Sequence, residues 1–128
     1  MRKTRVLIVD DDAVVRLAVV SSFAGDPNTE VTASSSAEEV LKRLASGERI
    51  DRLLVDWNMP GLNGLELVGA VRADPRFSNV RILMVTSETS MGHVKLALDI
   101  GADDYLMKPF TKEILVGKLA LLELECHE

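Results

Sequence analysis

Polar side chains that could bind or transfer a charged group stand where apolar runs of this 128-residue chain end. The clearest is Asp56, which closes the run Leu53-Leu54-Val55 and is soon followed by Pro60 and Gly61, two residues that favour a turn. Taken alone, Asp56 is better explained as an acid that caps or ends this turn. Other acids, hydroxyls and an amine follow other apolar runs in the same way: Asp10, Asp11, Thr86, Ser87 and Lys108. Together they indicate a binding or reaction site.

Such side chains can act together only if the fold brings them to one place. Apolar runs of strand length alternate with stretches of helical periodicity five times along the chain. This alternation predicts an α/β fold, a doubly wound parallel sheet with helices on both faces, formed as one domain by residues 1–128. The predicted strands are residues 5–10, 30–33, 53–56, 81–86 and 104–108, and the predicted helices begin near residues 12, 36, 62, 89 and 111.

Several local signals refine this prediction. Ser36 and Glu39 have the spacing of a capping box at the start of the second helix, and Asn63 is the expected cap of the third. The second strand is short and polar, which predicts a position at the edge of the sheet. His93 stands alone on the fourth helix without the partners of a metal site and is expected to face solvent.

The carboxyl ends of parallel strands share one rim of a doubly wound sheet, where ligands bind. The acids Asp10, Asp11 and Asp56 are therefore expected to meet there and to repel one another unless a cation neutralises them. Magnesium suits oxygen ligands and keeps room for a phosphate. Lys108 would add a second positive charge and Thr86 a hydroxyl donor, so the set predicts magnesium-assisted phosphoryl transfer onto Asp56.

Composition narrows the function further. The formal net charge of -5 and the isoelectric point near 5.1 argue against direct nucleic-acid binding, which uses clustered Lys and Arg. A single cysteine, Cys126, excludes a disulfide within the chain and favours a reducing compartment. The first apolar run is too short for a signal peptide, and no run approaches a membrane span. We expect a cytoplasmic protein without a membrane partner.

These motifs resemble the receiver domains of two-component response regulators, and the resemblance covers essentially the whole chain. The matching segments are Val9-Asp10-Asp11, the run from Asp56 to Gly61, Val85-Thr86-Ser87 and Lys108-Pro109-Phe110. The chain looks closest to the single-domain chemotaxis type. The resemblance implies a flavodoxin-like (βα)5 fold with a five-stranded sheet in the order 2-1-3-4-5. Asp12 departs from the pattern, because the chemotaxis relative has an apolar residue there, and it fits the first turn of a helix.

The resemblance also implies roles for individual residues. Asp56 would be the phosphoacceptor, Asp10 and Asp11 the acidic pair at Mg²⁺, and Asn58 a metal ligand through its backbone carbonyl. Lys108 would bind the phosphate, and its bond to Pro109 would be cis.

Further residues would govern the phosphorylated state. Thr86 and Tyr105 would form the switch pair; without the resemblance, Tyr105 is simply a half-buried strand aromatic. Asn58 and Glu88 would border the acyl phosphate and set its rate of hydrolysis.

The implied function is signalling. A histidine kinase or phosphotransfer domain would supply the phosphoryl group, and the chain would catalyse only its own transfer and hydrolysis. The phosphorylated form would act on a downstream protein through the fourth helix, the fifth strand and the fifth helix. The last helix is apolar around most of its circumference, which fits a partner face or a weak homodimer and fits scattered surface leucines equally well.

Two rival functions also fit the sequence. The run from Ile8 to Val14 matches haloacid-dehalogenase-like phosphatases, with Asp10 as the nucleophile and Asp12 as the acid/base. In that family the motif lysine precedes the acidic pair, whereas Lys108 follows Asp103-Asp104, and Asp56 would have no role. The other rival is a receiver-shaped binding module that is never phosphorylated. Such a module would be expected to lack one of the acids, the threonine or the lysine, and all are present.

Overall fold

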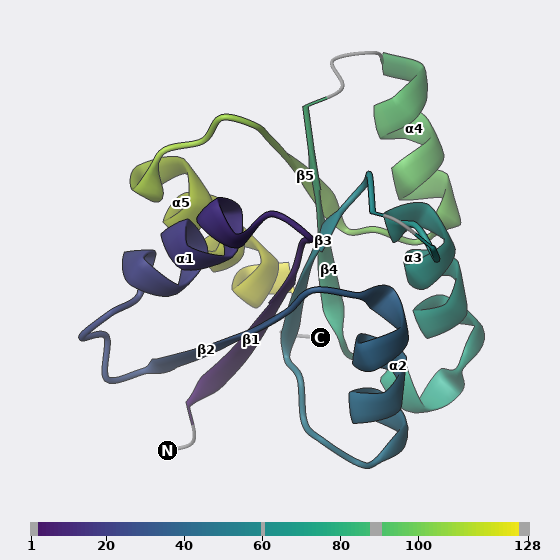
Figure 1. The fold of residues 1–128 in the computed structure, drawn as a ribbon, viewed down its shortest axis with the longest axis horizontal. Helices are drawn as coiled ribbons and strands as arrows, with labels where there is room; N and C mark the ends of the chain where they lie inside the picture. Colours follow the sequence, from purple (N-terminus) through teal and green to yellow (C-terminus); the bar gives the residue numbers. More distant parts are fainter. Residues whose placement is uncertain (1–2, 60, 88–90, 126–128) are drawn as a thin grey trace.

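Strands and helices alternate in the computed structural model, which describes residues 3–59, 61–87 and 91–125 (Figure 1). The strands are β1 (Thr4–Val9), β2 (Thr29–Ser34), β3 (Arg52–Asp56), β4 (Arg81–Thr86) and β5 (Asp104–Met107). The helices are α1 (Ala13–Ser22), α2 (Ala37–Ala45), α3 (Gly64–Ala73), α4 (Met91–Ile100) and α5 (Lys112–Glu125), with a short 3₁₀ turn at Pro75–Phe77.

All five strands form one parallel sheet in the order β2-β1-β3-β4-β5. The predicted doubly wound, flavodoxin-like fold is therefore confirmed, and β2 is an edge strand as expected. The sheet places β1 and β3 side by side although a whole βα unit separates them in the chain. The polar residues that follow these two strands are therefore neighbours.

Helices cover both faces of the sheet (Figure 1). Alternate residues of β1 point to opposite faces, with Val6 and Ile8 packed towards α1 and α5, and Leu7 and Val9 towards α2, α3 and α4. The central strands are apolar on both faces because both are buried. This packing makes the sheet a rigid support for the loops at its carboxyl edge.

The helix starts agree only in part with the sequence motifs. Asn63 and Glu66 form a complete capping box at α3. At α2, the Ser36 side chain accepts the Glu39 N–H, but the Glu39 carboxylate accepts instead from the Ser34 hydroxyl. The reciprocal half of the predicted box at α2 is therefore wrong, because a neighbouring hydroxyl from β2 takes the place of the backbone donor.

A few predicted boundaries shift. The strand β1 ends at Val9 and β5 at Met107, so Asp10 and Lys108 lie in loops rather than in strands. Asp12 is the N-cap of α1, where its carboxylate accepts the Val14 N–H at 2.9 Å. The predicted start of the fourth helix near residue 89 lies outside the described residues. Across the described part of the chain, no helix combines the length and apolarity needed to cross a membrane.

Candidate acidic site at the carboxyl edge of the sheet

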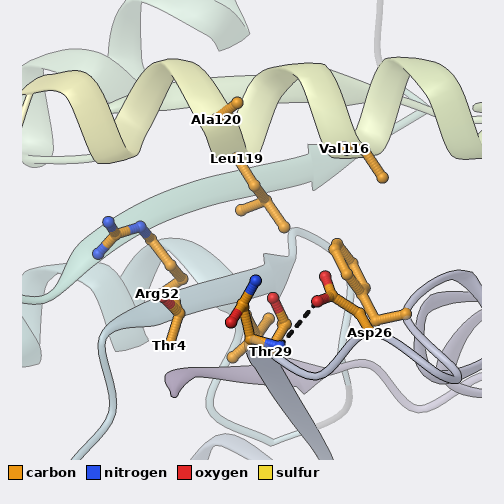
Figure 2. A pocket seen from close by; sticks show the side chains of 10 residues that line it. Thr4, Asp26, Thr29, Arg52, Val116, Leu119 and Ala120 are labelled. Carbon is orange, nitrogen blue, oxygen red and sulfur yellow. Dashed lines mark hydrogen bonds between the residues drawn. The ribbon is translucent and has the colours of Figure 1, made fainter. Parts of the chain in front are cut away.

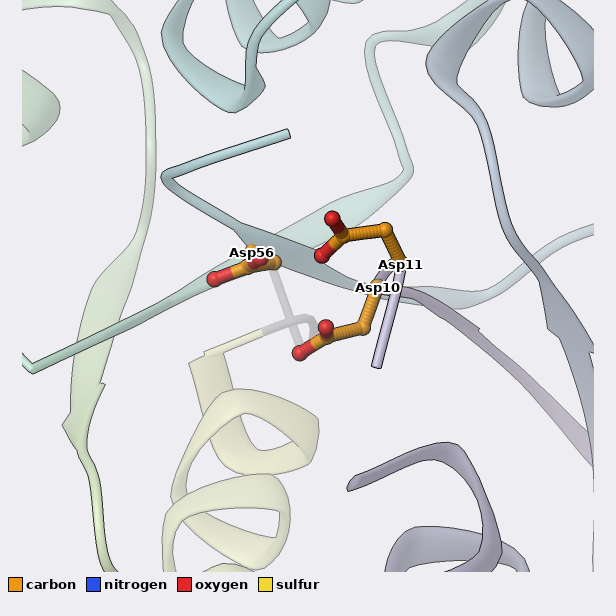
Figure 3. A group of neighbouring side chains, drawn as sticks. All are labelled: Asp10, Asp11 and Asp56. Carbon is orange, nitrogen blue, oxygen red and sulfur yellow. The ribbon is translucent and has the colours of Figure 1, made fainter. Parts of the chain in front are cut away.

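Three carboxylates meet where β1 and β3 end (Figure 3). Val9 and Val55 are paired in the sheet, so Asp10 and Asp56 stand next to each other at the rim. One carboxylate oxygen from each of Asp10, Asp11 and Asp56 lies within 4.8 Å of the others. Asp10 and Asp56 are buried and Asp11 is exposed, so the group opens to solvent on one side.

Lys108 reaches the same place from the loop after β5. Its Nζ lies 3.1 Å from Asp10 Oδ2 and 3.1 Å from Asp56 Oδ1. The Lys108 backbone N–H donates to the Thr86 carbonyl at 2.8 Å, and the following peptide bond to Pro109 is cis. One ammonium group thus bridges two buried carboxylates.

The backbone around these acids is closely packed. A Cβ atom at position 64 would lie 2.1 Å from the Asp56 carbonyl oxygen, so only glycine fits at Gly64. The Trp57 N–H donates to the Val85 carbonyl at 3.0 Å, which ties the residue after Asp56 to β4. The chain segment that carries Asp56 therefore lies in close contact with both α3 and β4.

Arg16 was not identified by its sequence pattern. From α1 it donates to the Asp10 backbone carbonyl at 2.6 Å, while the Asp12 N–H donates to Asp10 Oδ1 at 2.8 Å. Hydrogen bonds therefore fix both the backbone and the side chain of Asp10. A lone arginine in a helix carries no sequence signal for this contact, because the contact depends on how α1 is rotated against β1.

The charges at this edge are not balanced. Burial raises the pKa of Asp56, with a further increase from the charge of Asp10, and the hydrogen bond from Lys108 only partly opposes this. Burial alone would lower the pKa of Lys108, but hydrogen bonds and charges from Asp56 and Asp10 outweigh it and raise that pKa. Three acids and one lysine leave excess negative charge in a poorly solvated place.

This arrangement fits a divalent cation. Magnesium prefers carboxylate and carbonyl oxygens, and the clustered oxygens of Asp10, Asp11 and Asp56 supply that donor set. The Asn58 backbone also acts to lower the pKa of Asp56, so the loop that would offer the Asn58 carbonyl lies beside the cluster. The residues present therefore suit the ion that the sequence implied.

The hydroxyls and Tyr105 lie along the neighbouring strands. Thr86 is buried at the end of β4, and Ser87 is exposed directly after it. The register pairs Met84 with Tyr105 and Thr86 with Met107, so Thr86 and Tyr105 project from the same face of the sheet. Tyr105 is half-buried, and Lys118 Nζ lies 4.6 Å from the centre of its ring.

The loop after Asp56 contacts α4. The rings of Trp57 and His93 have centroids 5.0 Å apart and are tilted by 55°. The prediction that His93 faces solvent is therefore wrong: it is half-buried against Trp57, since α4 packs over the loop. Asn58 is exposed, and Glu88 lies outside the described residues.

One hollow in the surface adjoins this site, and another lies far from it. An apolar one of about 410 Å³ adjoins the acidic site and is lined by Val14, Val15, Ala18, Ser87, Lys108, Pro109 and Phe110. Another, of about 230 Å³, lies at the opposite edge of the sheet between α5 and residues such as Thr4, Thr29 and Arg52 (Figure 2). The second hollow contains none of the predicted site residues.

Comparison with known proteins agrees with this geometry. The family model for the response regulator receiver domain matches residues 6–120. The chemotaxis protein CheY1 of Helicobacter pylori is 35% identical over 118 residues, which are 92% of this chain and 95% of that protein. The chemotaxis protein CheY of Pseudomonas aeruginosa is 36% identical over 115 residues, covering 90% and 92% of the two chains.

A solved structure shows the same likeness. The chemotaxis response regulator CheY4 of Vibrio cholerae superimposes with a TM-score of 0.85 at 34% identity, over 94% of this chain and 98% of that one. The chain belongs to the response regulator receiver domain family, and these three relatives are of the chemotaxis type. Receivers of this kind are signalling domains that interact with histidine kinases and downstream targets.

Family membership also weakens the phosphatase alternative, and the site supplies a physical reason. The carboxylate of Asp12, the acid/base of that alternative, accepts the Val14 N–H as the cap of α1. Asp10, its nucleophile, is fully buried and held by Lys108 and the Asp12 N–H. Asp56, which that alternative leaves without a role, is one of the three clustered carboxylates.

Proposed function

We propose that this chain is a phosphoacceptor receiver, one domain over residues 1–128, that takes a phosphoryl group onto Asp56 from a histidine kinase or phosphotransfer domain. The observation that carries the proposal is the bridge from Lys108 Nζ to Asp10 and Asp56, each at 3.1 Å, beside a cluster of three carboxylates. A carboxylate held next to a lysine and a cation site is suited to receive phosphorus.

The transfer needs no reactant other than the phosphohistidine donor and water. An oxygen of Asp56 attacks phosphorus, the bond between phosphorus and the donor histidine nitrogen breaks, and the imidazole keeps the electron pair and takes a proton from water. In the resetting step, water attacks phosphorus, the bond to Asp56 breaks, and inorganic phosphate leaves. The chain acts only on itself, so it is not an enzyme with a separate substrate.

Asp10, Asp11, Asp56 and the Asn58 backbone carbonyl would hold Mg²⁺. When bound, the ion supplies positive charge beside the transferred oxygens. Lys108 Nζ supplies the protein's own positive charge and orients the Asp56 carboxylate for attack. Asn58 and Glu88 border the acyl phosphate in this proposal and set its lifetime.

The donor would approach over the apolar hollow beside Lys108. Two residues of α1 are largely exposed, Val14 at 74% and Leu17 at 66%. Helix α1 therefore offers apolar surface next to the reacting carboxylate.

The signal would pass through Thr86 and Tyr105, which share one face of the sheet. Phosphorylation adds negative charge that attracts the Thr86 hydroxyl, and Tyr105 fills the space left behind. The surface of α4, β5 and α5 then binds a downstream protein; a weak homodimer through the apolar residues of α5 is the second candidate. We place this activity in the cytoplasm, without direct contact to nucleic acid or membrane.

The test is to treat the protein with phosphoramidate and Mg²⁺ and to locate the phosphoryl adduct by mass spectrometry. We expect the adduct on Asp56 and its loss in Asp56→Asn, while Asp12→Asn reacts like the unchanged protein. An adduct on Asp10 would instead support the phosphatase, and no adduct would support the inert binding module.

A further inference from the structure

The contact between Trp57 and His93 joins the phosphoacceptor loop to the helix that would carry the signal. Trp57 follows Asp56 directly and is the single tryptophan of the chain. Its ring packs partly against the core, and it also meets the His93 ring, 5.0 Å away between centroids. Within the described segments, no backbone hydrogen bond joins Trp57 to His93, so the ring pair is their direct link.

The C-terminal end of helix α4 contacts α3. The Arg72 Nε–H donates to the Gly101 carbonyl at 2.8 Å, and Ile100 lies against Gly69 of α3. Among residues 92–100, whose side chains the structure describes, Ala97 is the one that is buried. By contrast, α3 buries Gly64, Leu67, Val68 and Val71. Among the described residues, α4 therefore buries fewer side chains in the core than α3, so a change in one contact can shift this helix.

We propose that His93 is a positioning residue whose ring, packed on Trp57, couples the occupancy of Asp56 to the position of the N-terminal half of α4. This inference rests on the proposed function. Phosphorylation moves the backbone around Asp56, Trp57 moves with it, and the tilted ring pair transmits that shift to α4. The route is separate from Thr86 and Tyr105, which lie on β4 and β5.

The size of the effect follows from the strength of aromatic pairs. A pair of aromatic rings that forms in only one of two helix arrangements raises the population ratio of that arrangement by about two- to tenfold. Coupling is reciprocal, so a ring that responds to the Asp56 site must also change the affinity of that site by the same factor. Removing the ring should therefore alter the binding of a phosphoryl analogue about two- to tenfold.

The experiment uses beryllofluoride with Mg²⁺ as the phosphoryl analogue. Trp57 emission and the hydrogen exchange of the α4 amides are followed in the unchanged protein and in four variants. His93→Ala and His93→Gln remove the ring, and His93→Phe keeps a ring. Lys95→Ala is the control, because Lys95 pairs on the surface of α4 with Asp99 at 2.8 Å.

We expect beryllofluoride to change the exchange of the α4 amides in the unchanged protein, in His93→Phe and in Lys95→Ala. In His93→Ala and His93→Gln, that change should fall by about half or more and the analogue affinity should shift about two- to tenfold. Urea unfolding of each variant shows whether the fold is kept. If one of the two ringless variants does not fold, the other still tests the coupling.

Two results would overturn the coupling. The first is a full α4 response in a folded ringless variant; the second is loss of the response in His93→Phe as well. If the unchanged protein itself gives no Mg²⁺-dependent response to beryllofluoride, the proposed function fails together with the coupling. That outcome differs from a normal response that is insensitive to His93, which rejects the coupling alone.

Discussion

The two edges of the sheet use charged side chains in opposite ways. At the amino edge, Asp103 accepts from Arg72 at 2.8 Å, from Arg81 at 3.3 Å and from the Ile82 N–H at 2.7 Å. At the carboxyl edge, Asp10, Asp11 and Asp56 cluster, and Lys108 pairs with two of them, Asp10 and Asp56. Donors outnumber acids around Asp103, and acids outnumber the lysine around Asp56.

The difference separates a structural cluster from a reactive one. Arg72 also donates to the carbonyls of Phe77, Val80 and Gly101, so it ties the ends of α3 and α4 to the sheet. Its hydrogen bonds are satisfied within the chain. The carboxyl edge keeps negative charge that the chain does not neutralise, which reduces stability and prepares a place for a cation and a phosphoryl group. Substitutions at the two edges should therefore have opposite effects on stability.

Asp56→Asn should abolish phosphoryl uptake while raising stability. The substitution removes one of the mutually repelling buried carboxylates, so the free energy of unfolding in metal-free buffer should rise by about 1 kcal/mol. Urea unfolding with a chelator measures the stability, and phosphoramidate labelling measures the uptake. A loss of stability would show that the carboxyl edge is a structural cluster like the amino edge.

Arg72→Ala should do the reverse. It removes one donor from Asp103 and from each of three partly buried carbonyls, so the free energy of unfolding should fall by about 3 kcal/mol. Urea unfolding midpoints provide the measurement. Arg76→Ala is the control: Arg76 pairs with Asp74 on the surface and should change the midpoint little. Equal effects of the two variants would contradict the structural role of Arg72.

Magnesium should stabilise the protein through Asp11. At a Mg²⁺ concentration of roughly ten times the dissociation constant, binding adds about 1.4 kcal/mol to the free energy of unfolding. Asp11→Asn should remove most of this gain with little change in metal-free stability, because Asp11 is exposed. Thermal unfolding with and without Mg²⁺ measures the gain.

Asp12→Asn is the matched control for Asp11. Asn can still cap α1 by accepting the Val14 N–H, so this variant should keep the Mg²⁺ gain. If both variants lost the gain equally, the ion would be responding to the overall charge of the loop rather than to a ligand.

Glu48, near the amino edge, should give a small effect that depends on pH. Its hydrogen bond from Arg43 lowers the pKa of Glu48, with burial opposing and the charges of Arg43 and Arg5 assisting. Because the pKa is lowered in the folded state, the pair stabilises the protein above the ordinary glutamate pKa of about 4.3, and this stability is lost as the pH falls through the lower folded value.

Glu48→Gln should therefore lower the free energy of unfolding by about 0.5 kcal/mol at neutral pH. The difference from the unchanged protein should vanish in strong acid. Urea unfolding across a pH series measures it. A difference that persists in strong acid would mean that Glu48 acts through packing rather than charge.

Much of the fold could be predicted from the sequence. The strand and helix order, the edge position of β2 and the Asn63 cap follow from periodicity and local motifs, which depend on near neighbours in the chain. The placement of the acids needed one further rule, that parallel strands end at a common rim. The predicted partner of the Glu39 carboxylate, the Ser36 backbone N–H, was wrong because the Ser34 hydroxyl on the preceding strand donates to that carboxylate instead.

The sequence alone determined which groups stand at the strand ends, because the alternation of apolar runs and helices sets where each strand stops. Tertiary structure decided which side chains these groups contact. Lys108 bridges Asp10 and Asp56, Arg16 donates to the Asp10 carbonyl, and the His93 ring packs against Trp57. The physical reason is that such contacts depend on the rotation and offset of each packed helix, to within a fraction of a helical turn. Those quantities result from the packing of the whole core and not from any single segment.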